Sequence, residues 1–229
     1  MYGMLSFSAD LNRHQRNRDM NNFSTEDLQR DEGILFILSG PSGVGKDTIL
    51  RRVIPRLSLI RTSISITTRD PRPHEKEGID YFFVTNEKFA TMLEQGDMLE
   101  HAAVHGHFYG TPRSWVEEEL NKGMDVILEI DVQGALQVRR EFPGAILLFL
   151  APPSWDELER RLRRRKTEDE LTIHKRLENA RHEMERIENY EYLVINDKLD
   201  EAVRDVESVI IAERLRPWRY SHFAKNEEE

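Results

Sequence analysis

The chain has 229 residues, a formal net charge of −9 and no cysteine. This acidic balance argues against a nucleic-acid-coating surface, and the absence of cysteine excludes a disulfide framework. Because no apolar run approaches the roughly 18 residues that span a bilayer, we expect a cytoplasmic protein without membrane or nucleic-acid partners, built as one domain with inserted lobes.

Extended and helical patterns alternate along the chain, which predicts an α/β fold with a parallel sheet covered by helices. Residues 1–32 are predicted to be a mobile polar extension and residues 216–229 a polar tail. In chain order the expected elements are a strand at 34–38, a helix over 46–57, an extended run at 59–66, a strand at 81–84, a helix over 86–95, a helix from Pro112 to Gly123, a strand at 126–130, a helix over 133–141, a strand at 145–150, helices that begin at Ser154 and at Thr167 (the second running to about 189), a strand at 192–195 and a helix over 199–215.

Three of these helices carry a start signal in the sequence. Thr111 is expected to be the N-cap of the helix that has Pro112 at its first position. Ser154 and Glu157 have the spacing of a capping box, and the same spacing recurs from Thr167. An arginine-rich stretch crosses between these last two helices.

The turn from Gly40 to Thr48, GPSGVGKDT, has the spacing of a phosphate-binding P-loop. In such a loop backbone N–H groups surround the phosphates and the lysine, here Lys46, neutralises their charge. Asp47 stands where the pattern has Ser or Thr. A carboxylate about 4 Å from a phosphate charge costs about 4 kcal/mol at a dielectric of 20, so Asp47 is expected to point away from the phosphates or toward Mg²⁺. It also suits the first turn of a helix without any further role.

Arginines are concentrated around a proline turn and in the run 160–165. Arg69 and Arg72 flank the turn and can present two guanidinium groups for bidentate phosphate binding, although arginines alone fit a surface ion pair equally well. The basic run fits the exposed face of a helix, or a lid that brings positive charge over a phosphate.

Five motifs occur in the order found in guanylate kinases, and the chain resembles that family over roughly residues 33–215. They are GPSGVGK, TTRDPRPHEKEGIDYFFV (67–84), Glu100 with HFYGTP (107–112), LEIDVQG (128–134) and RRRKTEDELTIHKRL (163–177). The resemblance implies a P-loop nucleoside monophosphate kinase fold, with a central parallel sheet flanked by helices, a small mixed-sheet GMP-binding lobe at about 64–114 and a short helical lid at about 160–172.

The resemblance also implies the reaction and its residues: the γ-phosphoryl group of ATP passes directly, in line, to GMP and dGMP in purine metabolism, with Mg²⁺ as cofactor. The implied GMP-binding residues are Ser65, Arg69, Arg72, Tyr81, Glu100, Tyr109, Thr111, Glu129 and Asp131. The implied ATP-binding residues are Gly40, Pro41, Ser42, Gly43, Val44, Gly45, Lys46, Asp47, Thr48, Arg165, Arg176 and Asn196. Lys46, Arg69, Arg165 and Arg176 are the implied catalytic residues, and Thr48 is the candidate to reach the metal through water.

Guanine presents donors at N1 and N2 and an acceptor at O6, so a carboxylate and a hydroxyl suit it. Glu100 and Thr111 supply this pair, and adenine would leave both wrongly paired, which can exclude AMP by about 10⁴ to 10⁵. One position departs from the family motif, and another has a second structural explanation. Lys166 stands where the lid motif often has glycine, and Asn196 fits a turn as well as a nucleotide contact.

Two other functions share part of this sequence pattern. An inactive guanylate-kinase-like module that binds phosphopeptides would have a degraded P-loop, and a kinase for sugar phosphates would lack the guanine-reading residues. The chain has an intact P-loop spacing together with Glu100 and Thr111. The sequence leaves open a monomer or a homodimer.

Overall fold

The computed structural model describes residues 30, 32–73, 75–104, 106–164 and 169–220. Among these, Glu32–Leu215 group into one compact unit. Outside this unit the chain forms a short 3-10 helix, η3 (Pro217–Arg219). None of the helices in the described ranges is long and apolar enough to cross a membrane.

The main sheet has five strands in the order β2-β7-β1-β8-β9, and every neighbouring pair is parallel. Its strands are β1 (Leu35–Ser39), β2 (Ile60–Thr62), β7 (Asp125–Glu129), β8 (Ile146–Ala151) and β9 (Tyr192–Ile195). All five residues of the central strand β1 are buried, because helices cover both faces of the sheet. The predicted parallel sheet is thus confirmed.

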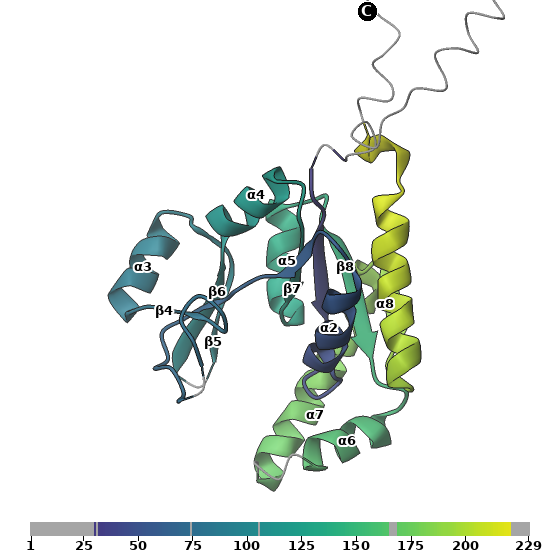
Figure 1. The fold of residues 1–229 in the computed structure, drawn as a ribbon. Helices are drawn as coiled ribbons and strands as arrows, with labels where there is room; N and C mark the ends of the chain where they lie inside the picture. Colours follow the sequence, from purple (N-terminus) through teal and green to yellow (C-terminus); the bar gives the residue numbers. More distant parts are fainter. Residues whose placement is uncertain (1–29, 31, 74, 105, 165–168, 221–229) are drawn as a thin grey trace, which may run out of the picture. The chain divides into compact units, whose positions relative to one another are not determined.

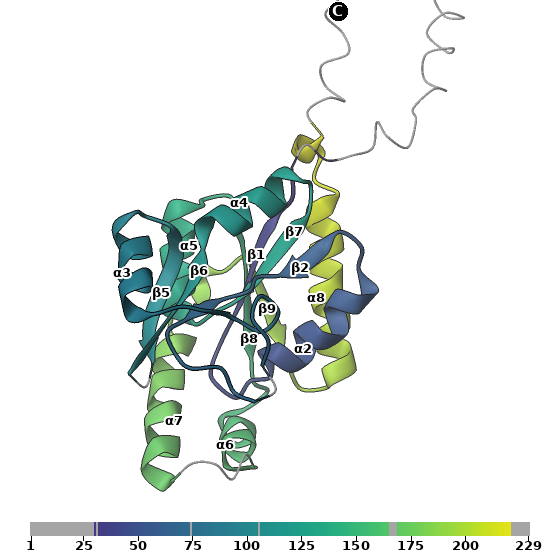
Figure 2. The same cartoon turned by 60° about the vertical axis from the view of Figure 1, so that its left-hand side comes forward.

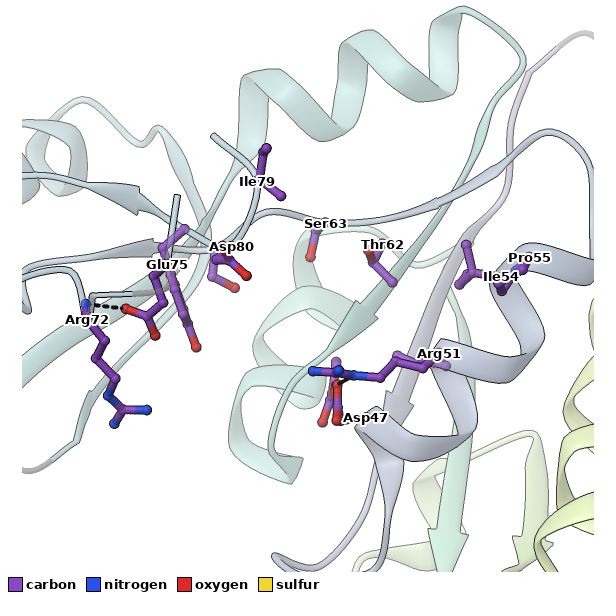
Figure 3. Close-up of a pocket in the computed structure, with 14 residues that line it drawn as sticks. Asp47, Arg51, Ile54, Pro55, Thr62, Ser63, Arg72, Glu75, Ile79 and Asp80 are labelled. Atoms are coloured by element: carbon purple, nitrogen blue, oxygen red, sulfur yellow. Dashed lines mark hydrogen bonds and ion pairs between the residues drawn. The ribbon is translucent and has the colours of Figure 1, made fainter. Parts of the chain in front are cut away.

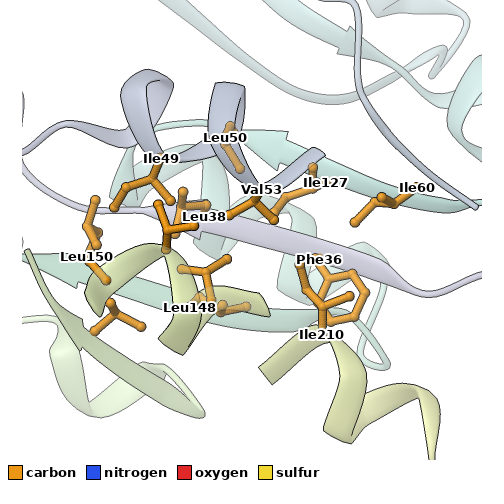
Figure 4. Packing of buried hydrophobic residues seen from close by; sticks show 14 of the residues in the cluster. Phe36, Leu38, Ile49, Leu50, Val53, Ile60, Ile127, Leu148, Leu150 and Ile210 are labelled. Atoms are coloured by element: carbon orange, nitrogen blue, oxygen red, sulfur yellow. The ribbon is translucent and has the colours of Figure 1, made fainter. Parts of the chain in front are cut away.

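Two helix pairs cover this sheet (Figures 1 and 2). On one face α2 (Lys46–Val53) and α8 (Leu199–Arg214) pack over the strands, and on the other α4 (Arg113–Asn121) and α5 (Val132–Glu141) do so. Figure 4 shows side chains of α2 and α8 converging with those of β1 and β8. The labelled residues of this cluster are Phe36, Leu38, Ile49, Leu50, Val53, Ile60, Ile127, Leu148, Leu150 and Ile210.

A second, four-stranded sheet has the order β4-β3-β6-β5 and mixes parallel and antiparallel pairs. Its strands are β3 (Ile66–Thr67), β4 (Phe82–Phe83), β5 (Met98–Val104) and β6 (His107–Pro112). Helix α3 (Asn86–Glu94) packs on it through the buried Phe89, which meets Ile66 and Met98. We call this sheet with α3 the acceptor lobe; it forms the mixed-sheet lobe that the resemblance implies.

Two helices follow β8 and precede β9. In α6 (Trp155–Arg164) the backbone N–H of Glu157 donates to Ser154 Oγ at 3.2 Å, which confirms the first capping interaction. The second predicted cap, Thr167, lies outside the described residues. The N-cap of α7 (Glu170–Met184) is instead Asp169, whose side chain accepts from Thr172 N at 2.8 Å.

Several predicted elements differ from the observed ones. The extended run at 59–66 is divided between β2 and β3, which belong to different sheets, so residues 63–65 connect the main sheet to the acceptor lobe. The helix predicted over 46–57 ends at Val53 and continues as the 3-10 helix η1 (Ile54–Arg56), where Pro55 interrupts helical hydrogen bonding. The helix predicted to reach 189 ends at Met184 and is followed by η2 (Ile187–Asn189).

Thr111 is not a helix cap, and this prediction was wrong. It belongs to β6, and the N-cap of α4 is Pro112, which has no side-chain cap hydrogen bond. The Thr111 hydroxyl has another partner, described below.

One buried ion pair joins α8 to the start of β7. Asp125 is fully buried, accepts from Ile34 N at 2.8 Å and accepts from Arg214 Nε at 2.7 Å. Replacing Asp125 by alanine is expected to lower the free energy of unfolding by about 3–5 kcal/mol, because the partly buried Arg214 loses its counter-charge. Urea denaturation measures the change. The matched control is Asp200→Ala, which removes an exposed pair with Arg52 and should cost under about 1 kcal/mol. Equal losses in the two variants would contradict the prediction.

Candidate active site

The predicted site residues gather where the parallel strands end. The P-loop follows β1, Asp131 follows β7, the arginine-rich helix follows β8 and Asn196 follows β9. In open parallel sheets ligands bind at these carboxyl ends. The acceptor lobe supplies the remaining predicted residues.

Three glycines shape the P-loop. Gly40, Gly43 and Gly45 have φ angles of 141°, 86° and 105°, which side-chain-bearing residues rarely adopt. A Cβ atom at Gly40 would also lie 2.1 Å from the carbonyl oxygen of Leu150. The loop is therefore restricted to glycine by both conformation and space, and it leads directly into the N-terminus of α2, where backbone N–H groups favour anions.

Lys46 and Asp47 begin α2 and point in different directions. Lys46 Nζ donates to the carbonyl oxygen of Gly40 at 2.6 Å, so its ammonium lies within the loop. Asp47 is turned along the helix instead, and its Oδ1 accepts from Arg51 Nε at 2.8 Å. The Asp47 side chain is 61% exposed, and Arg51 partly neutralises its charge. Repulsion between this carboxylate and a phosphate in the loop is thereby reduced.

A cavity of about 600 Å³ lies behind the P-loop. Asn196 lines it, is buried, and donates through Nδ2 to Val44 O at 2.8 Å, so it is a fixed part of the wall. Arg161 lines it too, and donates to Val44 O at 3.2 Å and to Asn196 O at 2.9 Å. The sequence showed Arg161 only as one member of a basic run. Nothing in that run distinguishes the arginine that faces inward.

Helix α7 also reaches the P-loop. Arg176 NH1 donates to Ser42 Oγ at 2.8 Å, which brings this predicted cation to the phosphate-binding loop. Arg165 and Lys166 lie outside the described residues. Two turns beyond Arg176 lies Glu183, which the sequence did not single out. Burial raises the pKa of Glu183 to about 7, while the charge of Lys46 lowers it and that of Asp131 raises it. Glu183 therefore lies within electrostatic reach of the P-loop lysine.

A second cavity, of about 780 Å³, lies between α2 and the acceptor lobe (Figure 3). The structure brings four of the predicted acceptor residues into its wall: Ser65, Arg72, Tyr81 and Glu129. Asp47 and Arg51 line it from the α2 side. Glu129 also lines a smaller cavity of about 220 Å³ together with Lys46 and Thr48, so it borders both the P-loop and the larger cavity.

Arg69 is held beside this cavity by a residue that the sequence did not identify. Its NH2 donates to both carboxylate oxygens of Glu75 at 2.9 Å, and its NH1 donates to Asp70 O at 2.6 Å. Glu75 also accepts from the backbone N–H of Arg72 at 2.8 Å and so fixes the turn that carries both arginines. Nε of Arg69 is buried without a hydrogen-bond partner among the described residues.

Aromatic rings surround the Arg69 guanidinium. Its carbon atom lies 5.5 Å from the ring centroid of Tyr81, within the range of a cation–π interaction. Tyr109 of β6 makes an edge-to-face contact with Tyr81, at 6.1 Å between centroids. The two predicted tyrosines are therefore neighbours, and they lie next to the arginine turn.

Glu100 and Thr111 form a buried pair on neighbouring strands of the acceptor lobe. They lie opposite each other in the β5–β6 pairing, and Thr111 Oγ1 donates to Glu100 Oε1 at 2.7 Å. Burial raises the pKa of Glu100 to about 7, the Thr111 hydrogen bond lowers it and the Asp131 charge raises it. Tyr109 and Thr111 are two residues apart on β6 and therefore face the same side. This geometry places the carboxylate–hydroxyl pair along the same strand face as Tyr109.

The start of α5 lies beside the Glu100–Thr111 pair. Asp131 is the N-cap of this helix and accepts from Gly134 N at 2.8 Å. A Cβ atom at Gly134 would lie 3.0 Å from Glu100 Oε2, so the absence of a side chain there leaves room for the carboxylate. In the sequence Glu129 and Asp131 form a pair, but in the structure they have different neighbours. Glu129 lines the two cavities described above, and Asp131 lies beside Glu100.

A P-loop on a parallel sheet, together with a small mixed-sheet lobe that carries an arginine turn and a buried carboxylate–hydroxyl pair, defines a P-loop nucleoside monophosphate kinase fold. The guanylate kinase family model matches residues 33–213. Guanylate kinases of Oceanobacillus iheyensis and Thermotoga maritima are 48% and 46% identical to the chain over 187 and 188 residues, which cover 82% of this chain and 91% of each relative. A solved structure of guanylate kinase from Anaplasma phagocytophilum matches with a TM-score of 0.67 and 32% identity, over 83% of this chain and 90% of that one. The chain belongs to the guanylate kinase family.

Proposed function

We propose that the protein transfers the γ-phosphoryl group of ATP to GMP and releases ADP and GDP. The observation that carries this proposal is the buried Glu100–Thr111 pair on the same strand face as Tyr109, next to the arginine turn. Such an arrangement suits a guanine base at one end and a phosphate at the other. The P-loop on the opposite side suits the donor nucleotide.

On the donor side, the P-loop backbone and Lys46 bind the β- and γ-phosphates of ATP, with Arg176 close to the same loop. The cavity that Asn196 and Arg161 line accommodates the rest of the donor. Arg165, which lies outside the described residues, is proposed to add charge from the lid.

Mg²⁺ is the proposed cofactor, and the available side chains fit it. No group of three or more His, Cys, Asp or Glu side chains in the described part of the chain is arranged to hold a metal ion. Mg²⁺ in kinases is held by phosphates, water and one or two protein oxygens, and Thr48 and Glu129 line one small cavity with Lys46. When bound, the ion would neutralise phosphate charge.

On the acceptor side, Arg69, Arg72 and the tyrosines hold the GMP phosphate, with Ser65 in the same wall. One of its oxygens attacks the γ-phosphorus as the bond from that phosphorus to the β-bridging oxygen breaks. The protein supplies alignment and positive charge, which are the main contributions that this reaction needs. Exclusion of water requires the acceptor lobe and the lid to close over both nucleotides.

Release of ADP from Mg·ATP in the presence of each nucleoside monophosphate tests this function. Turnover is expected with GMP, and with AMP it should be lower by about 10⁴, because adenine mispairs with Glu100 and Thr111. Absence of turnover with GMP, or equal turnover with AMP, contradicts the proposal. An inactive phosphopeptide-binding relative would give no turnover with any nucleotide.

The affinity for GMP should fall as the pH is lowered through about 7. The ionised carboxylate of Glu100 accepts from guanine, and its pKa is raised to about 7, so protonation below that value removes the acceptor. Between pH 8 and pH 6 the ionised fraction falls about tenfold, and so should the affinity measured by calorimetry. The GMP phosphate titrates near pH 6 as well. Glu100→Gln removes only the protein's contribution, and an unchanged pH profile in this variant would contradict the assignment.

The division into a core, an acceptor lobe at about 64–114 and a lid at about 160–172 remains a prediction, as do dGMP use and a monomer or homodimer. A cytoplasmic location is part of the proposal. The sequence has no cysteine and therefore no disulfide bond that would need an oxidising compartment to form.

A further inference from the structure

Two arginines line the central 780 Å³ cavity from different elements. Arg72 belongs to the acceptor lobe, and Arg51 belongs to α2. Figure 3 shows them on different sides of the opening. The family resemblance places Arg72 in the GMP site and Asp47 in the P-loop, but it assigns no role to Arg51.

The Arg51 guanidinium is oriented from one side only. Its Nε donates to Asp47 Oδ1 at 2.8 Å, and among the described residues its two terminal nitrogens have no hydrogen-bond partner. The hydrogen bond and charge of Asp47 raise the pKa of Arg51, with smaller contributions from Glu129 and Asp80. These two carboxylates also line the cavity, so Arg51 is within electrostatic reach of its interior.

Arg51 offsets the negative charge of the carboxylates that line this side of the cavity. Without it, this side of the cavity would present the carboxylates of Asp47, from α2, and Glu129, from β7, to a phosphate held by Arg72, and repulsion would oppose binding. With it, the wall presents a guanidinium whose free terminal nitrogens can donate to phosphate oxygens. The ordinary alternative is an exposed pair of oppositely charged residues one turn apart, and the Arg51 side chain is 79% exposed.

We propose that Arg51 is a further substrate-binding residue, which contacts the phosphate of GMP from the α2 side while Asp47 holds its Nε in position. The proposal rests on the proposed function, because it takes the acceptor phosphate to lie in this cavity. It also gives Asp47 a role in a P-loop where Ser or Thr is usual.

Calorimetric titration of GMP and of guanosine into Arg51→Met tests the proposal. GMP affinity is expected to fall about tenfold, at the lower end for a hydrogen bond between charged groups because the site is open to water. Guanosine lacks the phosphate and should bind as it does to the wild-type protein. The matched control is Arg52→Met, since Arg52 is the next residue on α2, pairs with Asp200 at 2.6 Å and does not line the cavity.

Equal GMP affinities in the Arg51 and Arg52 variants would overturn the proposal, and so would an equal loss for guanosine, which would indicate a general structural effect. The part played by Asp47 is measured by repeating Arg51→Met in an Asp47→Ala background, which removes the acceptor of the Arg51 Nε hydrogen bond. The loss should shrink to under about threefold there, since the arginine is no longer held, and an undiminished loss would remove Asp47 from the proposal. Failure of the proposed function is seen separately, as a wild-type protein that releases no ADP with GMP.

Discussion

Lys46→Ala is expected to lower kcat for ATP and GMP by at least about 10³-fold while GMP alone binds with wild-type affinity. The lysine ammonium lies within the P-loop, 2.6 Å from Gly40 O, where the donor phosphates are proposed to bind. The arginine turn lies in the loop between β3 and β4, and the Glu100–Thr111 pair lies on β5 and β6, so both belong to the other sheet or its loops. The variant therefore removes charge from the transferred group without altering the acceptor residues.

Steady-state kinetics and GMP calorimetry on the same preparation measure the two effects. Lys88→Ala is a suitable control. Lys88 is exposed on α3, far along the chain from the P-loop, and its replacement removes the same charge from the protein. Loss of GMP binding in the Lys46 variant would show that the donor and acceptor sites are not separate in the way proposed here.

The second large effect is expected from Glu100→Gln, which should lower kcat/KM for GMP by about 10² to 10³. A glutamine amide offers one acceptor and one donor group where guanine needs acceptance at both N1–H and N2–H₂. The Glu100 carboxylate is buried, with 7% of the residue exposed, so a mispaired donor there has little access to water. A mispaired buried group is costly for this reason.

IMP sharpens this test, because hypoxanthine keeps N1–H and O6 but lacks the exocyclic amino group. The preference for GMP over IMP should narrow in Glu100→Gln, whereas Glu94→Gln, at an exposed position in α3, should leave it unchanged. A uniform loss for GMP and IMP would indicate that Glu100 supports the lobe without reading the base.

Short-range patterns predicted much of the fold. The strand expected at 192–195 has these bounds in the structure, and the helix expected over 199–215 ends one residue earlier. The P-loop was identified because its glycine spacing follows from backbone geometry. The strands β5 and β6 were missed, since Glu100, His101 and His107 interrupt the apolar alternation that marks a strand.

The site was predicted less completely than the fold. Thr111 was read as a cap because a threonine before a proline is a common helix start, while its partner, Glu100, is eleven residues away in sequence and adjacent only in the sheet. Glu75 and Arg161 were missed because each lies in a charged stretch where every residue suits the surface equally well. The assignment of substrate contacts to individual residues stays a prediction.

The space that Gly134 leaves beside Glu100 affects how the base preference could be changed. A single methyl group at this position would come within 3.0 Å of a Glu100 carboxylate oxygen, so the carboxylate would have to shift by a few tenths of an ångström. Under the proposed function, purine choice is therefore expected to depend on a residue that has no functional group and carries no charge. A library selected for altered nucleotide use should vary position 134 together with position 100, because the volume left by one sets the range of carboxylate positions open to the other.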